Sequence, residues 1–265
     1  MCGGLVRTSS QQVRMNSHSV AAATQEHSAS RLNATLIKSV PLAAGAHHLT
    51  FRVDSQETLK FLPGQSICLD VPVAGNLTPS PYSIASAPRE DNCFEICIRR
   101  GSEGSAAARL CELNEGVQVR STQPKGGFVL KEPLADTVFL AAGTGIAPIR
   151  SMLHWMLHRE NGHGPARICL VFGAREKESL FFHQEFLHLA RQNQHFHYLP
   201  TLSRGQSDWN GARGYVQDHL HVLPLNPQTT HAYLCGPAAM IDSVCKALAK
   251  KGWPEDRVHF ERYEQ

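Results

Sequence analysis

The stretch Thr137-Val-Phe-Leu-Ala-Ala-Gly143-Thr-Gly145-Ile-Ala-Pro148 decides the fold of the second half of this chain. Its apolar first half is typical of a buried strand, and its glycines and proline are typical of a turn into a helix. Glycines at such a turn let the backbone approach a pyrophosphate, and the helix N-terminus offers free N–H groups and positive potential. The stretch therefore indicates a nucleotide-binding turn, with a turn needed only for packing as the alternative.

The same alternation of strand and helix continues to residue 265. Further strands are expected at residues 167–172, 197–202, 232–235 and 257–261, with amphipathic helical patterns between most of them. The alternation predicts an α/β fold with a doubly wound, five-stranded parallel sheet covered on both faces. Cys235-Gly236-Pro237 forms a second glycine–proline turn at the carboxyl end of the fourth strand, the edge at which open parallel sheets bind ligands. Two such turns at one edge favour a dinucleotide site.

Residues 31–133 follow a different pattern, with a period of two. Short alternating or apolar segments occur at residues 34–40, 48–53, 66–71 and 94–99. Turn signals such as Pro63-Gly64 separate them, so the pattern predicts an antiparallel β-barrel domain over residues 31–133, followed by the α/β domain over residues 134–265. Residues 1–30 are polar and lack an apolar period, so we expect a disordered tail there, with Met1 and Met15 as alternative starts.

Composition argues against several classes of protein. The chain has 265 residues with 26 Lys and Arg against 23 Asp and Glu, and without a basic run we expect no nucleic-acid partner. The longest apolar stretch, residues 138–149, is interrupted by glycines and is shorter than the roughly 20 residues of a membrane span. The eight cysteines include no C-x-x-C pair, and no H-E-x-x-H occurs among the histidines, so we expect no metal site. We expect reduced, mostly buried thiols and a cytoplasmic location.

Six short motifs occur in order along residues 31–265. They are Tyr82-Ser83, Pro124-Lys-Gly126-Gly-Phe128-Val-Leu130, Gly143-Thr-Gly145-Ile-Ala-Pro148, Phe172-Gly173-Ala174-Arg175, Cys235-Gly236-Pro237-Ala-Ala-Met240 and Glu261-Arg-Tyr263. Together they resemble the ferredoxin–NADP reductase-like superfamily, whose corresponding motifs are R-x-Y-S, P-x-G-x-F-x-L, G-T-G-x-A-P, Y-G-x-R, C-G-P-x-x-M and an acidic–aromatic terminus. The resemblance implies a flavin-binding barrel and an NAD(P)-binding sheet, with FAD as the flavin, FMN as the alternative, and NADPH or NADH as hydride donor.

The resemblance also implies roles for residues at the flavin. Tyr82 should flank the isoalloxazine and Ser83 should hydrogen-bond near its N5. Glu261 should relay protons or orient the nicotinamide, and Tyr263 should stack on the flavin until NAD(P)H displaces it. For each of them, ordinary packing or exposure is the alternative. The remaining residues expected to bind the flavin are Ile84, Ala85, Ser86, Arg99, Gly104 and Ala107.

Similar expectations apply to the nucleotide. Residues 143–145 should face the nicotinamide and pyrophosphate, with Cys235 beside the nicotinamide. The expected catalytic residues are thus Ser83, Cys235, Glu261 and Tyr263. Ser203 and Arg204 follow the third strand, where NADPH-using relatives bind the 2′-phosphate, and Arg175 ends the second strand. The other expected nucleotide-binding residues are Gly143, Thr144, Gly145, Pro148, Gly236, Pro237 and Met240.

Two positions depart from the family pattern. Ser80 stands where the flavin motif has arginine, and Ala107, three residues after Gly104, stands where the family has a hydroxyl. Loss of a charge-assisted phosphate contact costs about 1.5–3 kcal/mol, or about 10- to 100-fold in affinity. The flavin is therefore expected to be bound weakly or anchored differently. The candidate replacements are Arg99, Arg100 and Arg109.

The electron acceptor is expected to be a separate soluble partner. No C-x₄-C-x₂-C segment occurs, so we expect no iron–sulfur cluster in this chain. The resemblance implies a ferredoxin, a flavodoxin or an oxygenase component as acceptor. Two alternatives stay open, a flavin reductase that releases reduced free flavin and a non-catalytic electron-transfer or regulatory subunit.

Overall fold

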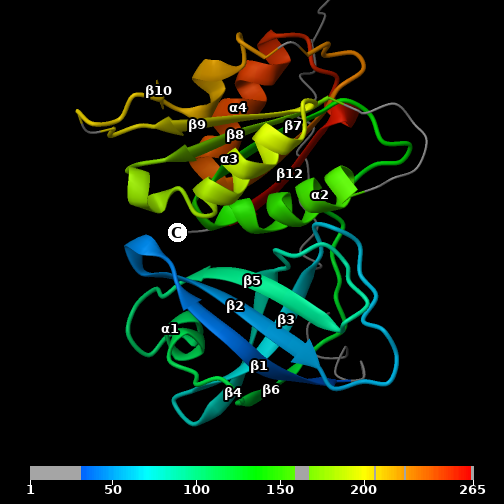
Figure 1. The fold of residues 1–265 in the computed structure, drawn as a ribbon, viewed down its shortest axis with the longest axis vertical. Coiled ribbons are helices and arrows are strands. Elements are labelled where there is room, and N and C mark those ends of the chain that lie inside the picture. Colours follow the sequence, from blue (N-terminus) through cyan, green and yellow to red (C-terminus); the bar gives the residue numbers. More distant parts are fainter. Residues whose placement is uncertain (1–30, 159–166, 206, 224, 264–265) are drawn as a thin grey trace, which may run out of the picture. The chain divides into compact units, whose positions relative to one another are not determined.

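The computed structural model describes residues 31–158, 167–205, 207–223 and 225–263. The tail expected over residues 1–30 lies outside the described residues. Two sheets of six strands each organise the described part of the chain (Figure 1). One ends with Ser121 and the other begins with Thr137, and the domain boundary near residue 134 stays a prediction.

The first sheet is antiparallel and curled. Its strands are β1 (Leu32–Pro41), β2 (Ala46–Val53), β3 (Ser66–Val73), β4 (Asn76–Ser83), β5 (Cys93–Arg99) and β6 (Gln118–Ser121), in the order β4-β3-β6-β1-β2-β5. Its two edges meet just after β4, where Ile84 bridges to Ile96 and the Ala85 N–H donates to the Glu95 carbonyl at 2.7 Å. The predicted antiparallel barrel is confirmed in the form of this half-barrel.

Alternation along the strands explains the barrel core. In an extended strand, successive side chains point to opposite faces, so every second apolar residue can enter the interior. Leu49, Phe51 and Val53 of β2 are buried in this way, and Phe51 stacks on Phe94 with ring centroids 5.4 Å apart. A short helix, α1 (Ala106–Cys111), packs against the barrel, and its N-cap Ser105 accepts the Ala108 N–H at 3.1 Å.

The second sheet is parallel. Its strands are β7 (Thr137–Ala142), β8 (Ile168–Ala174), β9 (Phe196–Leu202), β10 (Ala212–Arg213), β11 (His231–Pro237) and β12 (Val258–Tyr263), in the order β10-β9-β8-β7-β11-β12. The predicted count of five strands is wrong because β10 adds a sixth. This strand has two residues and pairs only with Thr201 and Leu202, so it has no apolar run by which its sequence would stand out.

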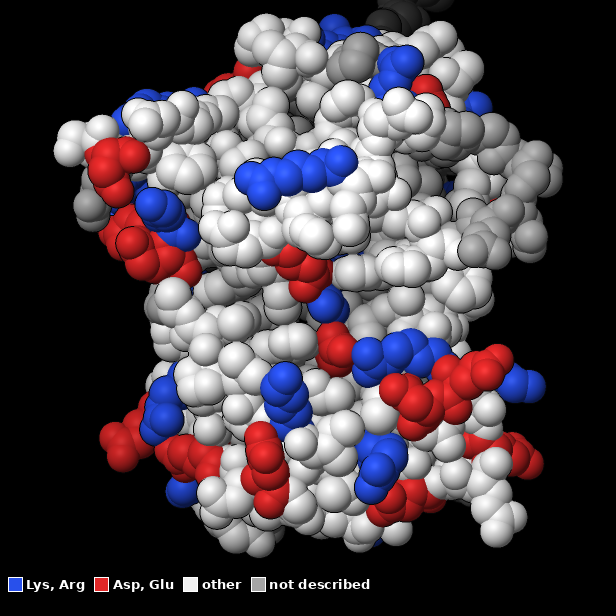
Figure 2. Space-filling view, in the orientation of Figure 1, with Lys and Arg blue, Asp and Glu red and all other residues white. Residues whose placement is uncertain are grey.

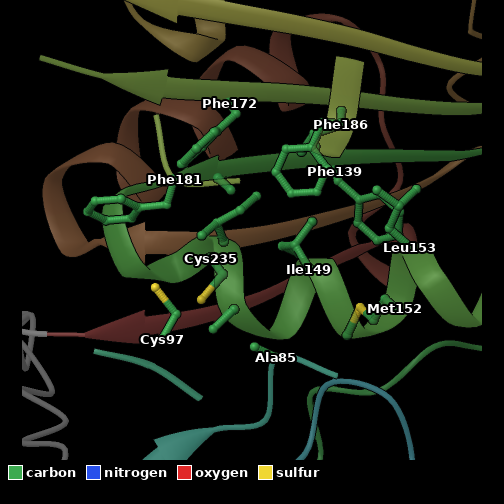
Figure 3. Packing of buried hydrophobic residues seen from close by; sticks show 14 of the residues in the cluster. Ala85, Cys97, Phe139, Ile149, Met152, Leu153, Phe172, Phe181, Phe186 and Cys235 are labelled. Atoms are coloured by element: carbon green, nitrogen blue, oxygen red, sulfur yellow. The ribbon is translucent and has the colours of Figure 1, made fainter. Parts of the chain in front are cut away.

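Helices cover both faces of the parallel sheet, as predicted. They are α2 (Ile146–His158), α3 (His183–Gln192) and α4 (Ala238–Lys250), and this part of the chain also has 3-10 turns at Gly143–Gly145, Lys177–Ser179, Val216–His219 and Glu255–Arg257, while the turn at Ala43–Gly45 belongs to the barrel. Phe139 and Phe172 pack with α2 and α3, whereas Leu140 and Val171 pack with α4 on the opposite face. Figure 3 shows α2 between this sheet and the barrel, with Ala85 and Cys97 on one side of the helix and Phe139 and Phe172 on the other.

Other sequence predictions concern single residue types. The seven described cysteines are all free thiols, and Cys93, Cys97, Cys111, Cys169 and Cys235 are buried. Among the described residues, no group of three or more His, Cys, Asp or Glu could hold a metal ion. No helix in the described ranges is long and apolar enough to cross a membrane. The cytoplasmic location stays a prediction.

Candidate functional site

The glycine turn after β7 packs directly against the second glycine–proline turn. A Cβ on Gly145 would lie 2.3 Å from the Cys235 carbonyl oxygen and 2.9 Å from the Gly236 nitrogen. Gly143 has a φ of +57°, in the left-handed region that favours glycine. Strands β7 and β11 are neighbours in register, with Cys235 beside Ala141, so the two turns lie at one sheet edge. The structure thus brings together two segments that the sequence singled out separately.

Tyr263 lies on the glycine turn. Its hydroxyl donates to the Ala142 carbonyl at 2.6 Å, and a Cβ on Gly143 would lie 2.9 Å from that hydroxyl. Burial raises the pKa of Tyr263 to about 12, so the hydroxyl is a neutral donor. The Tyr263 side chain thus contacts the glycine turn through its hydroxyl. Its stacking on a flavin stays a prediction.

Ser83 and Glu261 connect the barrel to the parallel sheet. The Ser83 hydroxyl donates to Glu261 Oε2 at 3.2 Å, across 178 positions of the chain. Glu261 is also the register partner of Cys235 in the β11–β12 pair. The four predicted catalytic residues therefore meet where the end of β4 approaches the ends of β11 and β12.

The protonation of this group follows from its burial. Burial raises the pKa of the Glu261 carboxyl, and the hydrogen bond from Ser83 opposes that rise only in part. Burial and the nearby Glu261 charge raise the pKa of the Cys235 thiol, which is 2% exposed. Cys235 is thus a neutral side chain, and Glu261 is a carboxyl that can hold a proton closer to neutral pH than an exposed glutamate can.

Tyr82 lies on an open strand edge that fits a flat ring. Strand β4 pairs with β3 on one side and is the edge of the sheet, and residues 76–79 are exposed. Tyr82 is half-buried there, and burial raises its pKa to about 12, with Ser80 as a hydrogen-bond partner of its hydroxyl. An unpaired backbone edge beside a fixed aromatic side chain suits an isoalloxazine, so the described residues fit a flavin here.

The next three residues of the predicted flavin motif are integrated into the core. Ile84 and Ala85 are fully buried, and the buried Ser86 hydroxyl receives the Glu95 N–H at 3.1 Å. Their contact with the cofactor stays a prediction, and their side chains serve packing in the structure.

The predicted anchors for the flavin phosphates lie around α1. Gly104 precedes the helix and Ala107 is in its first turn, while the Ser105 hydroxyl serves as the N-cap. Arg100 and Arg109 both pair with Glu112, so they share one carboxylate. Arg99 instead stands over the Phe181 ring, 6.0 Å from its centroid. Of the three candidate replacements for the missing arginine, only Arg99 extends toward the parallel sheet.

The residues predicted to bind the 2′-phosphate lie side by side. The Arg204 N–H donates to the Arg175 carbonyl at 2.9 Å, and the Ser203 N–H donates to the Ala174 carbonyl at 3.0 Å. The side chains of Arg175 and Arg204 are exposed at the carboxyl ends of β8 and β9. Pro148 is buried in the first turn of α2, and Met240 is half-buried beside Gly236 and Pro237.

Sequence reasoning missed two residues at this outer end of the sheet. Arg213 of β10 donates to the carbonyls of Gly205 and Trp209 and so shapes the loop after Arg204. Tyr215 follows β10 with a ring that is 64% exposed. The sequence signal that could have drawn attention to them is Arg213-Gly-Tyr215, which lies one loop further along the chain than Arg204.

Comparisons with known proteins cover both sheets. The family model "Oxidoreductase FAD-binding domain" matches residues 33–130, and "Oxidoreductase NAD-binding domain" matches residues 139–246. Ferredoxin–NADP reductase B of Sorangium cellulosum is 33% identical over 240 residues, which is 87% of this chain and 97% of that protein. The anthranilate 1,2-dioxygenase electron transfer component of Acinetobacter baylyi is 27% identical over 237 residues, 88% of this chain and 67% of that protein. The crystal structure of the Amycolatopsis cytochrome P450 reductase GcoB superposes with a TM-score of 0.78 at 26% identity, over 89% of this chain and 70% of that chain.

Proposed function

The chain belongs to the ferredoxin–NADP reductase-like superfamily, and from that premise we propose that it takes hydride from NADPH onto FAD and delivers electrons to a small redox protein. It is an NAD(P)H-dependent flavoprotein oxidoreductase with FAD and NAD(P)H as its cofactors. The observation that carries the proposal is the hydrogen bond between Ser83 and Glu261, because it joins the flavin motif to the nucleotide sheet.

The residues of the site hold groups in place and manage a proton. When bound, FAD supplies the chemistry that couples two-electron transfer from a nicotinamide to single-electron release. Gly143 and Gly145 carry no side chains, so a nucleotide can approach the backbone of this turn closely. Tyr82 offers a ring face and Cys235 a neutral, buried surface at the nicotinamide side. Burial raises the pKa of the Glu261 carboxyl, which can take up or release a proton at the site, and the Ser83 hydroxyl at the end of β4 donates a hydrogen bond to it.

NADPH is the nucleotide we propose. Arg175 and Arg204 are exposed, and their backbones are hydrogen-bonded to each other at the end of the sheet, with Ser203 beside them. A guanidinium group can donate two parallel hydrogen bonds to a phosphate, so these arginines suit a 2′-phosphate. Arg213 donates to the carbonyls of Gly205, the residue after Arg204, and of Trp209.

A separate ferredoxin- or flavodoxin-type carrier is the acceptor we propose, with an oxygenase component as the alternative. The match to the Sorangium reductase spans 97% of that protein, whereas the matches to the anthranilate dioxygenase and phenol hydroxylase components span 67% and 60% of those proteins. Steering by a basic patch at Arg99, Arg100 and Arg109 finds little support, because two of these arginines share Glu112. The face drawn in Figure 2 also mixes both signs of charge.

A flavin reductase that releases its product is the second candidate. Ser80 and Ala107 supply neither the charge nor the hydroxyl of the family pattern, and β4 is exposed over residues 76–79. Weak phosphate anchoring would suit a flavin used as a substrate.

The test is anaerobic reduction of the flavin by each nucleotide, with filtration to measure how much flavin stays bound. We expect NADPH to bleach bound FAD and stoichiometric FAD to be retained after filtration. Loss of the flavin on filtration would favour the release of free flavin, and no bleaching by NADPH or NADH would contradict the enzymatic function. Glu261→Gln and Ser83→Ala should slow the bleaching about 10- to 100-fold, while Glu255→Gln, an exposed acid before β12, serves as the matched control.

A further inference from the structure

Arg150 is a buried cation in an otherwise apolar part of α2. It is 9% exposed, and its helix neighbours Ile149, Met152 and Leu153 are buried core residues. A buried guanidinium is costly unless its donors are paired and its charge is balanced. Its presence at this position therefore needs partners, and the structure supplies them from two different parts of the fold.

On the side of the parallel sheet, Arg150 binds α3. Its Nε donates to Glu185 Oε1 at 2.8 Å and its Nη2 donates to Oε2 at 3.0 Å, a two-pronged contact with one carboxylate. The guanidinium also stands over the Phe182 ring, 4.7 Å from the centroid. These contacts fix the plane of the guanidinium group.

On the side of the barrel, the remaining nitrogen binds two acceptors. Nη1 donates to Glu95 Oε2 at 2.7 Å and to the Ala85 carbonyl at 2.9 Å. The next residue of the helix, Ser151, donates to the Ser86 carbonyl at 2.6 Å. Two consecutive residues of α2 thus hold two consecutive carbonyls of the barrel. Figure 2 shows acidic and basic side chains alternating at the waist between the two sheets.

The charges in this link persist over the ordinary pH range. Burial alone would raise the pKa of Glu95, but its hydrogen bond with His48 and the charges of Arg150 and Arg89 hold that pKa well below its usual value. Burial alone would raise the pKa of Glu185 too. Its hydrogen bond with His154 and its contacts with Arg150 outweigh that effect, so the pKa of Glu185 is lowered. The link is therefore a permanently charged one.

The position of the link gives it a role in the reaction. Ala85 and Ser86 are the second and third residues after Ser83 of the flavin motif, and Arg150 lies in the helix that begins just after Gly145. We propose that Arg150 is a positioning residue, which ties the segment after the flavin strand to the helix after the nucleotide turn and thereby sets the spacing of the two cofactor rings. This inference rests on the proposed hydride transfer between them.

Lysine is the informative substitution at this position. It keeps the positive charge but lacks the planar fork that reaches Glu185, Glu95 and the Ala85 carbonyl together. Arg150→Lys therefore removes the link while sparing the charge balance, and Arg150→Met removes both. Arg89→Met is the matched control, because Arg89 contacts the same Glu95 carboxylate at 2.9 Å but belongs to the barrel itself.

The experiment combines two measurements. Amide hydrogen exchange of the flavin-free protein reports local opening at residues 84–86 and 143–147, and rapid mixing with NADPH gives the limiting rate of flavin reduction separately from nucleotide affinity. In Arg150→Lys we expect faster exchange in both segments and a limiting rate about 10- to 100-fold lower, with the dissociation constant for NADPH changed less than about 3-fold. Reduction by dithionite, which needs no second ring, should be unaffected.

Either of two results would overturn the proposal. One is an Arg150→Lys limiting rate within about 2-fold of the parent protein with unchanged exchange. The other is an Arg89→Met variant that slows the reaction as much as Arg150→Lys does. If the parent protein itself is not reduced by either nucleotide, the proposed function fails, and exchange alone then decides whether Arg150 couples the two segments.

Discussion

The nucleotide turn at residues 143–145 and the flavin strand β4 differ in how tightly the rest of the protein packs against them. At the turn, backbone meets backbone, and a Cβ on Gly145 would lie 2.3 Å from the Cys235 carbonyl oxygen. The barrel is open along β4 and before α1: residues 76–79 are exposed, and a Cβ on Gly75, just before β4, or on Gly104, before α1, would meet nothing within 4 Å. The turn is constrained by the fold itself, whereas residues 76–79 of β4 are held by their pairing with β3 and leave their side chains exposed. The family motif is intact at the constrained region and altered, at Ser80 and Ala107, in the open one.

The largest effect should come from filling the constrained turn. Gly145→Ala places a methyl group against the backbone of Cys235 and Gly236 in β11. These backbone atoms cannot move aside as the end of a flexible side chain could. We expect a loss of at least about 100-fold in NADPH-dependent flavin reduction and of about 1–3 kcal/mol in the free energy of unfolding. Denaturant unfolding and rapid mixing measure the two.

Gly104→Ala is the control for that substitution. Gly104 has a positive φ, +77°, which Gly145 lacks, and open space surrounds it. It should cost about 1–2 kcal/mol for the left-handed backbone alone, with little change in nucleotide-dependent reduction. Equal losses of NADPH-dependent flavin reduction in the two variants would contradict the view that close packing at Gly145 is what the reaction requires.

A gain in FAD affinity is expected from a substitution in strand β4. Ser80→Arg restores the charge that the family pattern places beside the flavin phosphates, and Ser80 has space at an exposed edge. We expect FAD affinity to rise about 10- to 100-fold, measured by equilibrium dialysis. Leu77→Arg, an exposed residue of the same strand, controls for charge alone. An equal gain in both variants would mean that no phosphate site lies near Ser80.

A smaller effect is expected at the outer end of the nucleotide sheet. Arg204→Ala removes an exposed guanidinium from the proposed 2′-phosphate site, so KM for NADPH should rise about 10-fold while KM for NADH stays constant. Arg191→Ala on α3, also exposed, is the control. Steady-state reduction of a dye with each nucleotide measures both values. An equal rise in KM for NADH would mean that Arg204 contributes to the binding of both nucleotides and does not recognise the 2′-phosphate.

The smallest effect concerns pH and stability. Because the pKa of Glu261 is raised in the folded protein, its contribution is fully present below the unfolded pKa and is lost as pH rises through the folded pKa. As pH rises from 4 to 7, the free energy of unfolding of the parent protein should therefore fall relative to that of Glu261→Gln. Glu95 has a lowered pKa, so its contribution is present above its ordinary pKa of 4.5 and is lost as pH falls below that value, and there the parent protein should lose stability relative to Glu95→Gln. The same trend in both variants would contradict this assignment.

The two regions also differ in what the sequence could predict. Most strands of both sheets follow from periodicity, since burial on one or both faces leaves an apolar pattern. Strands β4, which is exposed over residues 76–79, and β6, with four residues, leave no such pattern and were not predicted from it. The two residues of β10 and the six of α1 are too short to leave one. Arg150 within an apolar helical stretch is visible in the sequence, but its partners Glu185 and Glu95 lie 35 and 55 positions away, and no local signal joins them. The family resemblance implied separate roles for Ser83 and Glu261 but not the hydrogen bond between them, which joins residues 178 positions apart.

The link at Arg150 has a consequence for experiments in which ionic strength is varied. Its side chain and that of Glu95 are each 11% exposed, so dissolved salt screens this pair far less than exposed pairs such as Arg109 with Glu112. Added salt should then weaken the encounter with a charged acceptor protein while leaving the two halves of this protein joined. Comparing the salt dependence of acceptor reduction with that of reduction of an uncharged dye therefore isolates the docking step.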